Sequence, residues 1–81
     1  MNRCFFIGKV YSNIKFDFIL NGKSISIVIC DIKLLDGNII KVKGYDEIAD
    51  YCYSKLKYGD VVNIEGIINN RMEIIIKMLN R

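Results

Sequence analysis

Histidine, the side chain used most often as a general base near neutral pH, is absent from this 81-residue chain. Its absence also removes the commonest metal ligand and the base of Ser-His and Cys-His nucleophile pairs. The acidic pairs Asp31 with Asp36 and Asp46 with Asp50 fall in turns and at a helix start, with no spacing that suggests a metal pair. We therefore expect no enzyme activity and no cofactor or metal site.

The three cysteines, Cys4, Cys30 and Cys52, are an odd number and form no C-x-x-C motif, so neither a disulfide framework nor a zinc site is indicated. Each lies among apolar residues, which favours a buried, reduced thiol. The N-terminal apolar run is too short for a signal peptide, and no segment is long enough to span a membrane. We expect a cytoplasmic protein without membrane contact.

The remaining candidates for chemistry are the 12 Lys and Arg side chains, which stand against 9 Asp and Glu. Lys41 and Lys43 alternate with Ile40 and Val42, so on a strand both lysines would point away from the core. Such a row of positive charge attracts phosphate groups. Because the net charge is only +3, tight binding of a polyanion would depend on this local grouping.

The composition indicates which elements position these lysines. Ile occurs 16 times and Tyr 5 times, whereas Ala occurs once and Pro not at all. Ile and Tyr favour strands, and the scarcity of Ala argues against a helical bundle. We expect a mostly β protein.

Turn signals divide the chain at Asn21-Gly22, Asp36-Gly37, Tyr58-Gly59-Asp60 and Asn69-Asn70. The segments between them alternate with period two, which predicts five strands. Their ranges are 4–20 with a bend at 12–13, 23–33, 38–44, 60–68 and 71–79. The alternation points Phe16 and Phe18 toward the core and places Met78 on the same face as Ile76.

Residues 45–57 differ, because Ile48, Ala49, Cys52 and Leu56 recur at helical spacing. We predict a helix here, with acidic residues in its first turn, basic residues in its last and Gly59 near its C-terminus. The order β-β-β-α-β-β is that of the OB-fold, a five-stranded Greek-key barrel with one helix between strands three and four. We expect residues 1–81 to form a single all-β OB-fold domain, with bends at Gly8 and Gly66.

Residues 2–10, in which Asn2-Arg3 is followed by an apolar run and Gly8, resemble the opening of bacterial single-stranded DNA-binding proteins. Asn21-Gly22 then falls on the Asn-Gly turn of that family without a gap. Residues 40–66 resemble the second half of the family's domain, up to Ile64-Glu65-Gly66. The resemblance implies an OB-fold that binds single-stranded DNA without a strong sequence preference.

Two long family loops are short in this chain, at 34–38 and 68–71, and with them go several aromatic residues that stack on bases. We also expect no acidic, Phe-ended tail, because the sequence ends at Arg81. The chain is nearer in size to the primosomal replication protein B type, or to phage and mobile-element versions.

The resemblance also implies a binding groove. Lys41 falls on a basic position of the family's DNA-contacting strand, and Tyr45 falls on the stacking aromatic that precedes the helix. Arg3 and Lys9 match or neighbour basic positions, and Lys33 and Arg71 flank loops that OB-folds use for binding. The predicted nucleic-acid-binding residues are Arg3, Lys9, Lys33, Lys41, Lys43, Tyr45 and Arg71. The alternative interpretation is a solvated strand face with Tyr45 packed at the helix entry.

We thus predict a single-stranded DNA-binding protein that acts in DNA replication or recombination of a bacterium, phage or mobile element. An apolar first strand, with Phe5 and Ile7 facing away from the core, predicts a homo-oligomer, a dimer or tetramer. One alternative is a protein-interaction OB module that serves as accessory subunit of a replication enzyme. A structured-RNA binder is a further alternative.

Overall fold

The computed structural model describes residues 2–11, 14–20 and 24–81, so the bend expected at 12–13 and the turn at Asn21-Gly22 lie outside the described residues. In this part of the chain the elements are β1 (Asn2–Val10), β2 (Lys15–Leu20), β3 (Ser24–Leu34), β4 (Ile39–Tyr45), α1 (Glu47–Lys55), β5 (Val61–Ile68) and β6 (Ile74–Asn80). The first predicted strand therefore corresponds to β1 and β2 together.

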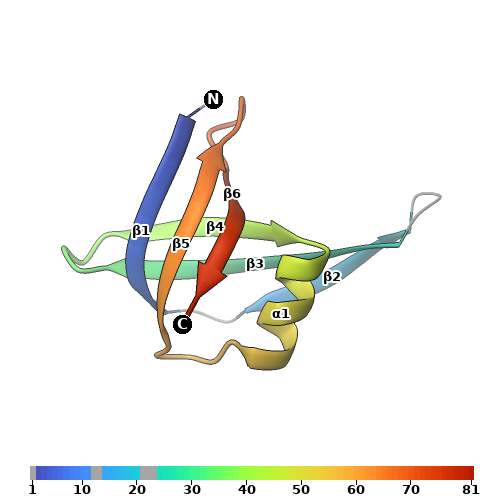
Figure 1. The fold of residues 1–81 in the computed structure, drawn as a ribbon, viewed down its shortest axis with the longest axis horizontal. Coiled ribbons are helices and arrows are strands. Elements are labelled where there is room, and N and C mark those ends of the chain that lie inside the picture. The colour runs from blue at the N-terminus through green and yellow to red at the C-terminus, as the bar shows by residue number, and fades with distance from the viewer. Residues whose placement is uncertain (1, 12–13, 21–23) are drawn as a thin grey trace.

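Five strands close into a barrel in the order β1-β5-β6-β4-β3, and a short pairing between β1 and β3 completes the ring. The β4–β6 pairing is parallel and the other pairings are antiparallel. Figure 1 shows β1, β5 and β6 crossing β3 and β4, with α1 beside the end of β4. The predicted OB-fold, an all-β barrel with one helix between β4 and β5, is confirmed.

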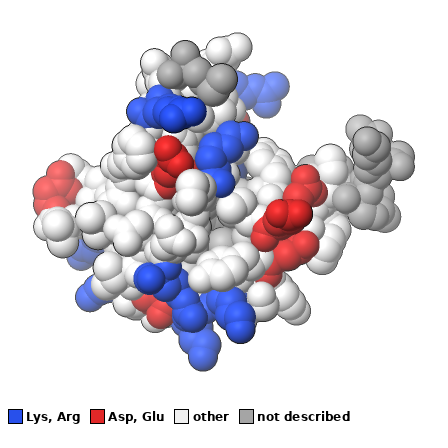
Figure 2. Space-filling model, in the orientation of Figure 1, with Lys and Arg blue, Asp and Glu red and all other residues white. Residues whose placement is uncertain are grey.

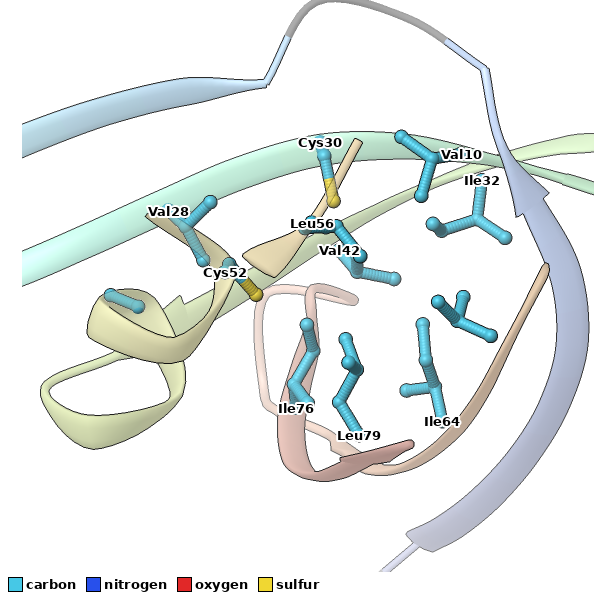
Figure 3. Close-up of a cluster of buried hydrophobic side chains, with 12 residues drawn as sticks. Val10, Val28, Cys30, Ile32, Val42, Cys52, Leu56, Ile64, Ile76 and Leu79 are labelled. Atoms are coloured by element: carbon cyan, nitrogen blue, oxygen red, sulfur yellow. The ribbon is translucent and has the colours of Figure 1, made fainter. Parts of the chain in front are cut away.

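The barrel is filled by aliphatic side chains from every strand of the ring (Figure 3). β3 contributes Val28, Cys30 and Ile32, β4 contributes Val42, and β5 contributes Val62 and Ile64. On α1, Ala49 and Cys52 are buried, and the helix packs against β3, β4 and β6. The helix therefore covers one end of the barrel with its apolar face.

The helix is shorter than predicted and ends differently. It spans Glu47–Lys55, and Leu56 is already extended. Gly59 has a φ of +81°, as a glycine in a tight turn can, but it lies beyond the helix in the loop to β5. Its N–H donates to the carbonyl of Val10 at 3.0 Å, which ties this loop to the end of β1.

Two predicted side-chain directions are wrong. Phe16 packs on the core, but Phe18 is 68% exposed, because the outer part of the β2–β3 pair extends beyond α1 and the barrel (Figure 1). In β6, Gly66 pairs with Ile76 and Glu65 pairs with Met78, so β6 has one extra residue at this point. This bulge shifts the alternation by one, which exposes Met78 and buries Leu79.

Candidate nucleic-acid interface

The outer surface of β3 and β4 carries the predicted groove residues. Lys41 and Tyr45 are exposed and Lys43 is partly exposed, whereas Val42 and Gly44 between them are buried. Across the ladder, Lys41 lies opposite Asp31, Lys43 opposite Ile29 and Tyr45 opposite Ile27. The predicted alternation of β4 is confirmed, and it gives this face three positions for ligand contact in one row.

Tyr45 lines a groove at the end of β4, together with Asn2 of β1, the end of β5 and the β5–β6 turn. We call it the Tyr45 groove; its lining residues are Asn2, Tyr45, Ile67, Ile68, Asn69, Asn70, Arg71 and Glu73. The fold thus brings Tyr45 and Arg71 together. Arg3 lies beside the groove, because it pairs with Ile67 across the β1–β5 ladder. An aromatic face with nearby guanidinium groups suits a nucleotide.

The β5–β6 turn is built around Asn69. Its side-chain oxygen accepts hydrogen bonds from the backbone N–H groups of Arg71 and Glu73, both at 2.9 Å. Met72, in the same turn, has the left-handed conformation, with a φ of +62°. Among the described non-glycine residues only Met72 and Asp46 have positive φ. Each is next in sequence to a residue that lines the Tyr45 groove.

Lys43 of β4 forms an ion pair with Glu73. Glu73 directly precedes β6, the strand that pairs in parallel with β4. Glu73 also accepts a 3.0 Å hydrogen bond from the Asn69 side-chain amide. The hydrogen bond with Glu73 raises the pKa of Lys43, and the bonds from Lys43 and then Asn69 lower the pKa of Glu73. Both groups are therefore charged near neutral pH, and part of the positive charge of Lys43 is neutralised.

Lys9 and Lys33 lie apart from the Tyr45 groove, at the junction where β1 pairs with β3. They are direct partners in that ladder, and the ammonium group of Lys33 lies 5.2 Å from the centroid of the Tyr11 ring. The seven predicted residues thus form two groups, with Lys41 on the strand between them. Sequence reasoning missed Tyr11 and Glu73; the alternation Lys9–Tyr11 was a signal for the first of these.

Charge is unevenly distributed on the face drawn in Figure 2, where acidic side chains gather at the right and basic ones at the top and bottom. The acidic group lies over the beginning of α1, whose first turn carries Glu47 and Asp50. A negative helix start is unfavourable for phosphate. The positive potential on this face is therefore weakest at the beginning of α1.

Two classes of site find no support in the described ranges. No cluster of three or more Cys, Asp or Glu side chains in them is arranged to hold a metal ion. No helix within these ranges has the length and hydropathy that a membrane span requires.

No family model matches the sequence, and no curated protein matches it. Solved structures do match. The single-stranded DNA-binding (SSB) domain of a Synechococcus sp. protein superimposes with a TM-score of 0.85 at 17% identity, covering 100% of this chain and 96% of that one. This chain has the fold of an SSB domain. The sequence resemblance is thereby confirmed at the level of the fold.

Two further structures share the architecture. A mitochondrial single-stranded DNA-binding protein of S. cerevisiae matches with a TM-score of 0.82 and 16% identity over 98% of this chain and 91% of that one. The dimeric N-terminal domain of PriB from Thermoanaerobacter tencongensis matches with a TM-score of 0.66 and 19% identity, over 98% and 93%. The SSB fold accounts for almost the full length of all three matched chains.

Proposed function

We propose that this protein binds single-stranded DNA with little sequence preference, along the outer face of β4. The observation that carries the proposal is the row Lys41, Lys43 and Tyr45, which leads into the Tyr45 groove beside Arg71. Cations along a strand with an aromatic face at its end supply the two contacts that single-strand binding needs, phosphate neutralisation and base stacking. The shared fold with two single-stranded DNA-binding structures supports the same conclusion.

Each predicted residue has a role in this proposal. Tyr45 stacks on a base, and Arg71 and Arg3 bind phosphates at the groove, as Lys41 does along the strand. Lys43 contributes a charge that Glu73 reduces. Lys9 and Lys33 extend the positive surface beyond β4.

The test is fluorescence anisotropy with a labelled oligothymidylate at low salt. The double variant Lys41→Ala, Tyr45→Ala removes a phosphate contact and a stacking face, so we expect affinity to fall at least about tenfold. Lys77→Ala removes an exposed lysine from β6 and is the control, which should bind like the wild type. Equal affinities of the double variant and the wild type would place DNA elsewhere on the molecule.

A second surface supports self-association. Phe5 is 72% exposed and Ile7 55% exposed on β1, and with Leu34, Leu35 and Met78 they line an apolar groove of about 760 Å³. Residues 2–7 of β1 pair with β5 alone among the described strands, because the pairing of β1 with β3 begins at Gly8. An open strand edge beside an exposed apolar groove favours pairing with a second copy. We propose a homodimer through β1, and the PriB domain that shares this fold is itself dimeric.

The same apolar groove favours a second candidate function, an accessory protein-interaction module of a replication enzyme. It is lined by β1, β5, β6 and the β3–β4 turn, and none of Lys41, Lys43 and Tyr45 lines it. Capture of a polymerase, primase or helicase, combined with indifference to oligonucleotides, would select this alternative. For the first function we propose a context of DNA replication or recombination in the cytoplasm of a bacterium, or in a phage or mobile element.

A further inference from the structure

Tyr11, Lys9 and Lys33 meet where β1 leaves β5 and crosses onto β3. Lys9 pairs with Lys33 in the ladder, and the backbone N–H of Tyr11 donates to the carbonyl of Asp31 at 3.0 Å. The Lys33 ammonium lies 5.2 Å from the centroid of the Tyr11 ring, within the range of a cation–π contact. We refer to these three residues as the Tyr11 cluster.

The two lysines stand directly opposite each other, an arrangement that destabilises a pair of strands when the charges are alike. Two ion pairs occur in the described part of the chain, Lys43–Glu73 and Arg81–Asp60, and neither involves these lysines. The cluster therefore concentrates the positive charges of Lys9 and Lys33, and neither of these two ion pairs neutralises them.

One neighbouring carboxylate, that of Asp60, is engaged by groups outside the cluster. Asp60 is close in the fold, since its carbonyl accepts the N–H of Val10 at 2.9 Å. Its carboxylate, however, accepts from the N–H of Lys57 and from the Arg81 guanidinium. Neither ion pair of the described ranges, Lys43–Glu73 or Arg81–Asp60, places a carboxylate on Lys9 or Lys33, so both ammonium groups can contribute to binding an anion.

The Tyr11 side chain is 51% exposed, and the Lys33 ammonium lies over its ring. A ring held in this way can stack on a base, while the ammonium groups of Lys9 and Lys33 bind the adjoining phosphate. The Tyr45 groove has a similar combination, with Tyr45 as the aromatic ring and Arg71 and Arg3 as the cations.

The two places are connected through neighbouring strands. Tyr11 is joined to Asp31 by its backbone hydrogen bond, Asp31 faces Lys41, and Tyr45 is four residues further along β4. At about 3.3 Å per residue, Lys41 and Tyr45 are about 13 Å apart along the strand, and neighbouring strands are about 4.8 Å apart. A single OB-fold contacts about 4–16 nucleotides, so one DNA strand can reach both.

We infer that the Tyr11 cluster is a second binding position for the same DNA strand, which takes one base on Tyr11 and its phosphate between Lys9 and Lys33. The inference rests on the proposed function and adds the direction of the strand's path, from the Tyr45 groove past Lys41 to the β1–β3 junction. It also predicts that affinity depends on DNA length.

The test compares oligothymidylates of about 4 and about 12 nucleotides, which lie near the ends of the range for one OB-fold. We expect Tyr11→Ala to weaken binding of the longer strand about fivefold or more, and to reduce the affinity gained between the two lengths. Tyr11→Phe keeps the ring and should retain that gain. Tyr53→Ala, which removes an exposed ring from α1, is the matched control and should leave both affinities unchanged.

Lys9→Gln provides a second variant that leaves all aromatic rings in place. It should reduce the salt dependence for the longer strand by about 0.7 in the log–log slope, as expected for one lost phosphate contact. If Tyr11→Ala and Lys9→Gln bind the longer strand like the wild type, the Tyr11 cluster is not part of the path although the proposed function stands. If the wild type binds neither strand, the proposed function itself is wrong.

Discussion

Glu73 determines how much of the charge of Lys43 is available to a ligand. The Lys43–Glu73 ion pair is partly exposed, and exposed ion pairs contribute little to stability because water and salt screen them. A phosphate can therefore compete with Glu73 for Lys43 at small cost. The carboxylate of Glu73 lines the Tyr45 groove, so a phosphate that binds Lys43 has to displace it.

Glu73→Gln should accordingly increase affinity for oligothymidylate by about two- to fivefold, because Lys43 is then free to bind phosphate. The salt dependence should become steeper by about 0.7 in the log–log slope. Anisotropy titrations at two salt concentrations measure both effects. Glu65→Gln removes a carboxylate that lines the apolar groove instead and should change neither quantity. Weaker binding by Glu73→Gln would mean that Glu73 positions the groove and does not compete for Lys43.

The buried thiols make stability depend on pH. Burial, with smaller contributions from Cys52 and Asp31, raises the pKa of Cys30 to about 12, and burial raises the pKa of Cys52 to about 11. The folded protein therefore holds these protons above pH 9.0, the ordinary thiol value, where the unfolded chain releases them. A raised pKa stabilises the fold fully below the unfolded value, and this stabilisation is lost as pH rises.

We expect the free energy of unfolding in urea to fall above about pH 9 by up to about 1.4 kcal/mol per pH unit for each thiol. The double variant Cys30→Ala, Cys52→Ala should be less stable at pH 7 but should lose less stability between pH 9 and 10. Parallel slopes for the two proteins over that interval would show that the thiols do not ionise on unfolding.

At the scale of elements, local pattern predicted most of the fold. The alternation of β4, the turn at Asp36-Gly37 and the helical spacing of Ala49 and Cys52 each depend on residues close together in the chain, and each is confirmed. The inward direction predicted for Met78 was wrong because the bulge in β6 arises from pairing with Glu65 and Gly66 of β5. The inward direction predicted for Phe18 was wrong because alternation does not reveal where a strand extends beyond the barrel.

The barrel closes where β1 crosses onto β3, and Gly8 permits that approach. A Cβ at Gly8 would lie 2.4 Å from Ile32 Cγ2 and 2.8 Å from the Lys33 carbonyl oxygen, which belongs to the backbone. We expect Gly8→Ala to lower the free energy of unfolding by about 1–3 kcal/mol, as overpacking of a tight contact does. Urea unfolding measures this, with Lys77→Ala as the surface control. Stability equal to the wild type would mean that β1 and β3 can separate without cost.

At the scale of the whole molecule, we propose that the apolar groove on β1 mediates assembly and that the row on β4 binds DNA. Ile7→Glu places a carboxylate in the apolar groove, where burial without a partner is costly. We expect size-exclusion chromatography with light scattering to show a wild-type dimer and an Ile7→Glu monomer. Met72→Glu changes an exposed apolar side chain in the β5–β6 turn and should leave the dimer intact. A monomeric wild type would contradict assembly through β1.

The sequence predicted those positions of the candidate site that depend on neighbours along one strand. Lys41 and Lys43 could be placed outward by alternation alone, and Tyr45 followed from the resemblance. The Lys43–Glu73 pair joins residues 30 apart through the parallel β4–β6 contact, and the Tyr11 cluster depends on the register of β1 against β3. Such long-range pairings are set by barrel closure and leave no periodic signal in the sequence.

The most direct test of the central claim is the salt dependence of oligothymidylate binding by the wild type between about 50 and 200 mM. If about four phosphates are neutralised, the logarithm of the association constant should fall against the logarithm of salt concentration with a slope near −3, and Lys41→Ala should reduce its magnitude by about 0.7. Absence of binding at about 50 mM salt, or an affinity independent of salt, would contradict single-stranded DNA binding along β4.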